Sequence, residues 1–99
     1  MSGPLSIEGE LTVFAVHALK DRIMAALAES STLQINLSDV SEVDGAGIQL
    51  LLAAKREAQQ RGGTLSLVGH PPPFIAALEL TDLAREFGDP LVLDVETTA

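Results

Sequence analysis

The spacing of apolar side chains alternates between a two-residue period and a helical one, and each change of period predicts a new element. Two short apolar runs separated by Glu-Gly-Glu predict a β-hairpin or bent strand pair over residues 5–7 and 11–14, with Gly9 at the turn. From Ala15 the period becomes helical. The apolar stripe of this first helix consists of Val16, Leu19, Ile23, Ala26 and Leu27. Alternation over residues 33–37 then predicts a strand with one buried face.

The second half of the chain repeats this order of strand and helix. Val40 and Val43 continue the apolar spacing through an expected loop, and a Leu-rich helix follows and ends at Arg-Gly-Gly. Residues 65–68 predict a strand, and the connector His-Pro-Pro-Pro-Phe introduces a third helix, since proline is tolerated in a first helical turn. The apolar side of that helix is expected to hold Phe74, Ile75, Leu78 and Leu80. Another helical turn is expected at 83–87 and a short strand at 91–93.

The resulting order, β-β-α-β-α-β-α-β, predicts an α/β fold. We expect a single domain over residues 1–99, with a small mixed sheet of four to five strands and three to four helices packed on it. The last residues, 95–99, are expected to be a frayed tail.

Composition and charge narrow the range of functions. The net charge of −8 opposes binding to the phosphates of nucleic acids or to an anionic membrane. The chain has no cysteine, which excludes disulfides and thiolate metal sites. Neither a signal peptide nor an apolar run long enough to cross a membrane is visible, so we expect a cytoplasmic protein without membrane insertion.

A bare turn, Asp44-Gly45-Ala46-Gly47, opens the second helix. The Asp44 carboxylate is well placed as an N-cap, and it is equally a candidate partner contact. The glycines either keep the surface flat for close backbone approach or satisfy the geometry of the turn. Gln49 and Ala53 follow on the helix face away from the apolar stripe, where they either contact a partner or form an ordinary solvated face.

Chemistry beyond binding has little support in the sequence. Gly-Ala-Gly lacks the lysine and hydroxyl of a P-loop, which argues against a nucleotide cofactor. His17 and His70 are too far apart in sequence to suggest a metal site. There is no nucleophile elbow and no His-Glu metal motif, so we expect no enzymatic activity.

Three stretches of the chain together resemble the STAS domain of anti-sigma factor antagonists. The central one is INLSDVSEVDGAGIQLLLAAKREAQQRGGTLSLVGH, flanked by GELTVFAVHALKDRI and ALELTDLAREFG. The family pattern is Leu-Ser, two β-branched residues, Asp, an acceptor Ser or Thr, a small residue, Gly and a Leu-rich helix. The matching residues are Leu37, Ser38, Val40, Val43, Asp44, Gly45, Ala46, Gly47 and Ile48.

The resemblance implies signalling by partner switching, in which a kinase phosphorylates the acceptor hydroxyl at the helix N-terminus and so changes the bound partner. The acceptor position is Gly45, which has no hydroxyl, and Ala46 has none either. The resemblance therefore implies a docking surface whose phospho-acceptor position, Gly45, is not phosphorylatable. The expected partner-binding residues are Asp44, Gly45, Ala46, Gly47, Gln49 and Ala53.

Several partners remain open at this stage. The leading ones are an anti-sigma factor or serine kinase of the histidine-kinase-like ATPase class, or a protein of bacterial chemotaxis signalling. A different class of function is also compatible with the Ala46-Gly47 pair: a soluble accessory subunit that braces the ATPase subunit of a phospholipid-trafficking ABC transporter, whose matching turn resembles this one.

Overall fold

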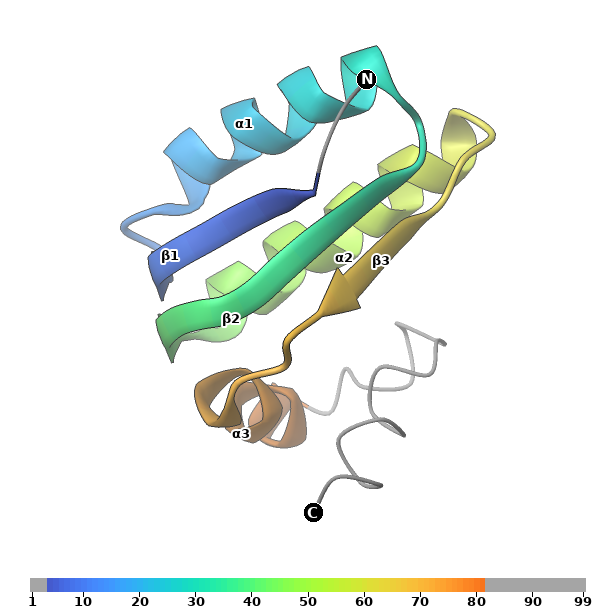
Figure 1. Ribbon diagram of the computed structural model, residues 1–99. Coiled ribbons are helices and arrows are strands. Elements are labelled where there is room, and N and C mark those ends of the chain that lie inside the picture. Colours follow the sequence, from blue (N-terminus) through green and yellow to red (C-terminus); the bar gives the residue numbers. More distant parts are fainter. Residues whose placement is uncertain (1–3, 82–99) are drawn as a thin grey trace.

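Strands and helices alternate along residues 4–81, the part of the chain that the structure, a computed structural model, describes (Figure 1). In chain order the elements are β1 (Leu5–Leu11), α1 (Val16–Glu29), β2 (Leu33–Val43), α2 (Gly45–Gln60), β3 (Leu65–Val68) and α3 (Pro72–Thr81). A helix follows every strand, and this order favours parallel pairing because the chain must return before the next strand begins.

The described sheet is parallel throughout, in the order β1-β2-β3. Leu11 at the end of β1 lies opposite Val43 at the end of β2, so both strands finish at the same edge of the sheet. β3 is shorter and pairs with β2 only from Leu33 to Asn36. Below the later part of β2, α3 packs against that strand where β3 no longer runs beside it (Figure 1).

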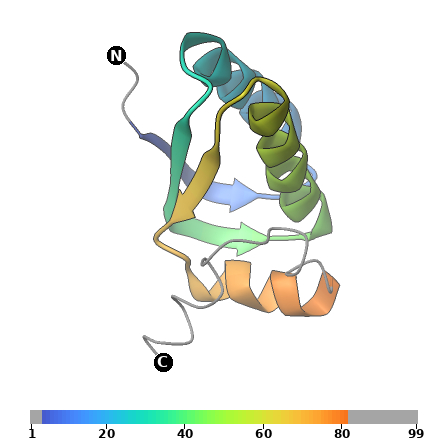
Figure 2. The ribbon, with the colours of Figure 1, turned by 90° about the vertical axis from the view of Figure 1, so that its right-hand side faces the viewer.

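Helices α1 and α2 cover one face of the sheet (Figure 2). Among residues 4–81, the core between the layers is aliphatic except for Phe74 of α3. The strands contribute Ile7, Leu11, Leu33, Ile35, Leu37, Val40, Leu65 and Leu67 to it. Their intervening side chains are mainly polar and exposed on the opposite face, as expected for strands buried on one side.

The hairpin expected near the N-terminus is wrong. Residues 5–11 form one continuous strand, and Gly9 lies inside it with a φ of +77°, next to a shift in register. Pairing with β2 satisfies backbone groups on both sides of the glycine, so the strand continues through Glu-Gly-Glu instead of turning. Residues 12–15, part of the second expected strand, form the loop to α1.

The loop expected around Val40 and Val43 is also wrong, because β2 extends through both residues. Between Asn36 and Asp39, and again between Val40 and Glu42, β2 contains one residue more than the paired stretch of β1. Each extra residue reverses which side chains face the core. The uneven apolar spacing that indicated a loop is therefore the spacing of a bulged strand.

Two further expectations need correction or fall outside the described residues. Leu80 does not belong to the apolar side of α3, since its side chain is 88% exposed. Phe74, Ala77 and Leu78 are buried at helical spacing, and Leu80 lies two residues past the last of them, about 200° around the helix. Residues 4–81 contain three parallel strands, so a mixed sheet of four to five is not confirmed. The expected elements at 83–87 and 91–93 and the tail at 95–99 lie outside the described residues.

Candidate functional site

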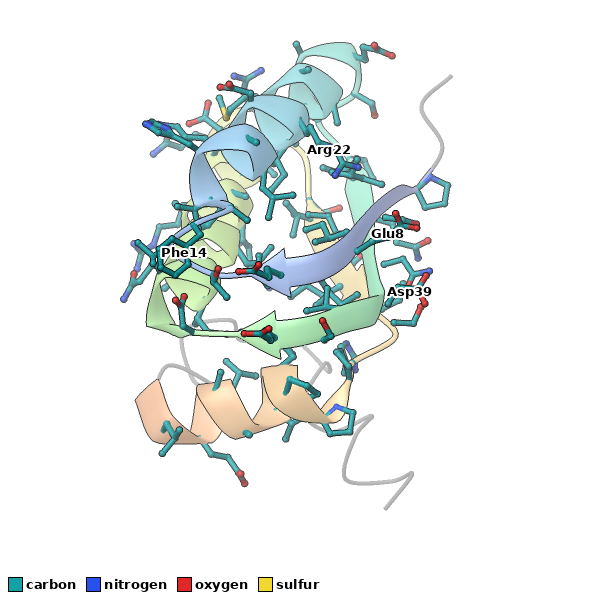
Figure 3. The ribbon with its side chains drawn as sticks, turned by 90° about the vertical axis from the view of Figure 1, so that its left-hand side faces the viewer. Glu8, Phe14, Arg22 and Asp39 are labelled. Atoms are coloured by element: carbon teal, nitrogen blue, oxygen red, sulfur yellow. The ribbon has the colours of Figure 1, made fainter. Side chains whose placement is uncertain are left out.

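The parallel sheet brings two connections together at one edge. Because β1 and β2 end opposite each other, the loop 12–15 and the turn 44–46 leave the sheet side by side. Phe14 in that loop lies beyond the carboxyl ends of both strands (Figure 3). The carboxyl edge of a parallel sheet is where binding sites of α/β proteins occur most often.

Asp44 ties these two connections together. Its Oδ1 accepts a hydrogen bond from the Gly47 backbone N–H at 3.1 Å, which confirms the predicted N-cap of α2. Its Oδ2 accepts another from the Val13 backbone N–H at 3.0 Å, in the loop that follows β1. The backbone N–H of Asp44 donates to the Leu11 carbonyl at 3.2 Å. The carboxylate therefore caps one element and anchors a second, and only the first role was predicted from sequence.

The N–H groups of Val13 and Gly47, and to a smaller extent that of Ala46, lower the pKa of Asp44 below its ordinary value of 3.8, against an opposing effect of desolvation. The carboxylate is thus an ionised hydrogen-bond acceptor at neutral pH, a poor state for a general acid.

The pH dependence of stability is expected to reveal this double role. A carboxylate pKa that is lower in the folded state stabilises the fold above the unfolded pKa, and the contribution is lost as pH falls through 3.8 toward the folded value. An Asp44→Asn variant offers one acceptor oxygen in place of two, so it is expected to be less stable than wild type at neutral pH.

Urea unfolding of both proteins between about pH 7 and about pH 2 measures the difference. Below the pKa, protonated Asp44 and the asparagine of the variant each have a single full acceptor, so the difference in stability is expected to narrow. A difference that stays constant over the whole range would contradict the two-acceptor role.

The residues of the Gly-Ala-Gly turn have separate environments. Gly45 is exposed at the first position of α2, and Ala46 is half-buried. Gly47 is buried, and a Cβ built on it would overlap the Leu11 carbonyl oxygen and lie 2.8 Å from the Leu11 carbonyl carbon. Gly47 therefore allows another backbone segment to approach α2 closely, and that segment is the end of β1 in the same molecule. Close backbone approach was one of the two roles considered for the glycines. Contact of these residues with a partner stays a prediction.

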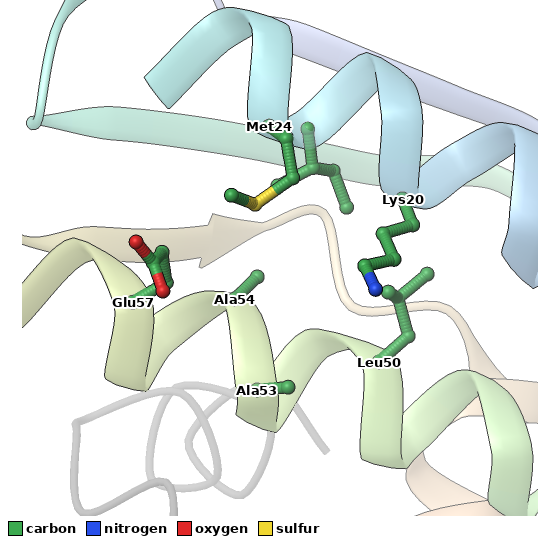
Figure 4. A pocket seen from close by; sticks show the side chains of 7 residues that line it. Lys20, Met24, Leu50, Ala53, Ala54 and Glu57 are labelled. Carbon is green, nitrogen blue, oxygen red and sulfur yellow. The ribbon is translucent and has the colours of Figure 1, made fainter. Parts of the chain in front are cut away.

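Gln49 and Ala53 are exposed on α2. Ala53 lies eight residues beyond Gly45, about 12 Å along the helix, so it is separated from the turn. It lines a hollow of about 400 Å³ between the helices, termed the α1–α2 groove (Figure 4). The groove is lined by Lys20, Ile23, Met24, Leu50, Ala53, Ala54 and Glu57. The predicted partner-binding set is therefore spread over two neighbouring surfaces.

A second hollow, the α3 groove, adjoins the turn itself. Its volume is about 500 Å³. One wall is formed by the end of β2 and the start of α2, and the other wall by one side of α3. Its lining residues are Glu42, Val43, Asp44, Gly45, Pro73, Ala76, Ala77 and Leu80. Sequence reasoning missed this groove because Leu80 was assigned to the core; the available signal was its position off the Phe74–Leu78 side of the helix.

Metal and membrane sites find no support in the described chain. Over residues 4–81, no group of three or more His, Asp or Glu side chains is placed to hold a metal ion. In the same range, no helix combines the length and apolar character needed to cross a membrane.

Comparison with known proteins agrees with this architecture. The family model described as Mlab, STAS domain matches residues 2–94. An anti-sigma-B factor antagonist of Bacillus subtilis (strain 168) is 25% identical over 79 residues, which cover 80% of this chain and 72% of that protein. A crystal structure of a candidate anti-sigma factor antagonist from Thermotoga maritima superposes with a TM-score of 0.68 at 24% identity, covering 79% and 68% of the two chains. Because the family model spans nearly all of the sequence, this chain belongs to the STAS domain family.

Proposed function

We propose that this chain is a non-enzymatic signalling protein, similar to anti-sigma factor antagonists, that docks a regulatory protein in the cytoplasm. The partner is an anti-sigma factor or serine kinase of the histidine-kinase-like ATPase class. Docking takes place at the turn that opens α2. Gly45 occupies the position of the phospho-acceptor, so binding is not switched by phosphorylation at that position.

One observation carries the proposal: Gly45 is exposed at the first position of α2, at the sheet edge where the loop after β1 also begins. Asp44 holds both segments through its two oxygens, which favours a surface that is organised before a partner arrives. A preorganised surface binds without an added cost of ordering. A glycine without a side chain lets a partner approach the backbone closely.

The choice of partner class rests on the Bacillus subtilis relative, whose name states that it antagonises an anti-sigma factor. Charge adds independent support. The chain carries a net charge of −8, which favours a partner with a basic surface and disfavours nucleic acid.

The test is a set of calorimetric titrations with purified partners. The wild-type chain is titrated with each histidine-kinase-like ATPase domain encoded in the same genome, with the chemotaxis signalling proteins and with the ABC-transporter ATPase subunits. We expect a dissociation constant of about 1 μM or tighter for one ATPase domain of the first class, typical of a specific protein interaction.

The other outcomes redirect the assignment. Binding only to a chemotaxis protein would keep the signalling role and change the pathway. Binding only to an ABC ATPase subunit would replace signalling with the accessory role in lipid transport. No binding to any of these proteins would contradict the proposed function.

A further inference from the structure

The exposed large apolar side chains of residues 4–81 lie on two segments that adjoin the turn opening α2. They are Val13, Phe14 and Leu80, with 57%, 90% and 88% of their surface exposed. Val13 is bonded through its backbone to Asp44, and Leu80 lines the α3 groove together with Asp44 and Gly45. Large apolar side chains exposed beside a candidate docking turn suit a surface that binds another molecule.

From this arrangement we infer that Phe14 is the apolar anchor of the docking surface, and that the partner protein receives it in an apolar socket bordered by lysine or arginine. The inference rests on the proposed function, since it concerns the same partner and the same edge of the sheet. It adds a residue to the predicted site and specifies the chemistry of the opposing surface.

Hydrogen bonds hold the backbone of the loop that carries Phe14. The Phe14 backbone N–H donates to the Thr12 hydroxyl at 3.3 Å, and the N–H groups of Ala15 and Val16 both donate to the Thr12 carbonyl. The Thr12 hydroxyl in turn donates to Glu10 Oε1 at 2.8 Å. Together with the Val13–Asp44 bond, these contacts fix the loop at both ends, so Phe14 projects from a fixed backbone (Figure 3). Aromatic residues, phenylalanine among them, are enriched at protein interfaces relative to the rest of the surface.

Acidic residues beside the anchor define the kind of partner. Glu10 and Glu42 are exposed neighbours on adjacent strands, and Glu42 also lines the α3 groove. With Asp44 they place three carboxylates at the edge of the sheet where β1 and β2 end. A second copy of this chain would bring the same acidic group against itself, and an anionic membrane would be repelled. A protein with a basic border around an apolar socket is the complementary occupant.

The experiment is a titration of the ATPase domain that binds wild type with the Phe14→Ala and Phe14→Leu variants. Phe14→Ala is expected to weaken binding at least about 10-fold, as for an interface anchor, and Phe14→Leu is expected to retain most of the affinity. Both variants should unfold at the wild-type temperature, because the side chain is 90% exposed. A Glu42→Gln variant should bind more slowly and show a weaker dependence on salt.

Parallel titration of Gly45→Asp separates the two proposals. If Phe14→Ala binds like wild type while Gly45→Asp does not, the anchor is wrong and the docking function stands. If neither substitution changes the affinity, the partner binds elsewhere and both site assignments are wrong. If wild type binds none of the tested partner proteins, the proposed function fails, and the anchor that rests on it fails with it.

Discussion

Replacing Gly47 with alanine is expected to lower the free energy of unfolding by about 1–3 kcal/mol or more, the usual cost of forcing extra volume into a packed interior. The new methyl group would overlap the Leu11 carbonyl oxygen and approach the Leu11 side chain to 2.7 Å. Two of the three closest atoms belong to the backbone, so a change of side-chain rotamer cannot relieve the overlap. The end of β1 would have to move away from α2.

The measurement is urea unfolding followed by circular dichroism, with Gly45→Ala as the matched control. Gly45 is exposed and has no positive φ, so alanine there is expected to be neutral or to stabilise α2 by up to about 1 kcal/mol. Equal stability of the two variants would show that the contact between α2 and Leu11 is looser than the geometry indicates.

Gly47→Ala is also expected to change the candidate docking site. Leu11 precedes the loop that Asp44 holds, and its carbonyl accepts a hydrogen bond from the Asp44 backbone. Displacing the end of β1 would therefore separate Phe14 from the turn. Gly47→Ala is expected to impair partner binding even under conditions where the variant is folded.

Local signals were sufficient to predict much of the fold. α2 and β3 lie where the helical spacing and the short apolar run placed them, and the aspartate before the helix is its N-cap. Asp44 could be assigned because a capping residue and its partner are three residues apart, within the reach of sequence reasoning. The apolar stripe of α1 was likewise visible from its period, with Leu19, Ile23 and Leu27 buried.

Long-range contacts account for what was missed. The bulges in β2 become visible only when its residues are paired with those of β1, because the register belongs to both strands. The bond between Val13 and Asp44 joins residues 31 positions apart. Phe14 was counted as part of a strand and lies instead in the loop that Asp44 holds. Leu80 is the exception, because its position off the buried side of α3 was a local signal.

The second large effect is expected on binding: Gly45→Asp should weaken the affinity for the partner at least about 30-fold. A carboxylate buried against a partner without a counter-charge costs roughly 2–5 kcal/mol, and about 1.4 kcal/mol corresponds to a factor of ten. The new charge would also add to Asp44 and to Glu42 at the rim of the α3 groove. A partner with a basic border would offset part of this cost. The expected loss of about 30-fold therefore corresponds to the lower end of the energy range, about 2 kcal/mol.

Loss of binding by this variant would not reflect unfolding. An acidic residue in the first turn of a helix interacts favourably with the helix dipole, and Gly45 is exposed. Gly45→Asp should therefore be about as stable as wild type in urea. Ala25→Asp provides the matched control, since it adds the same charge at an exposed position of α1 nine residues beyond its start, about 13 Å along the helix.

Docking through the turn that opens α2 is tested most directly by the dissociation constants of wild type, Gly45→Asp and Ala25→Asp for the same purified ATPase domain, measured in one buffer. The expected result is a loss of at least about 30-fold for Gly45→Asp and an affinity within about threefold of wild type for Ala25→Asp. Equal affinities for wild type and Gly45→Asp, with both proteins folded, would contradict docking at this turn.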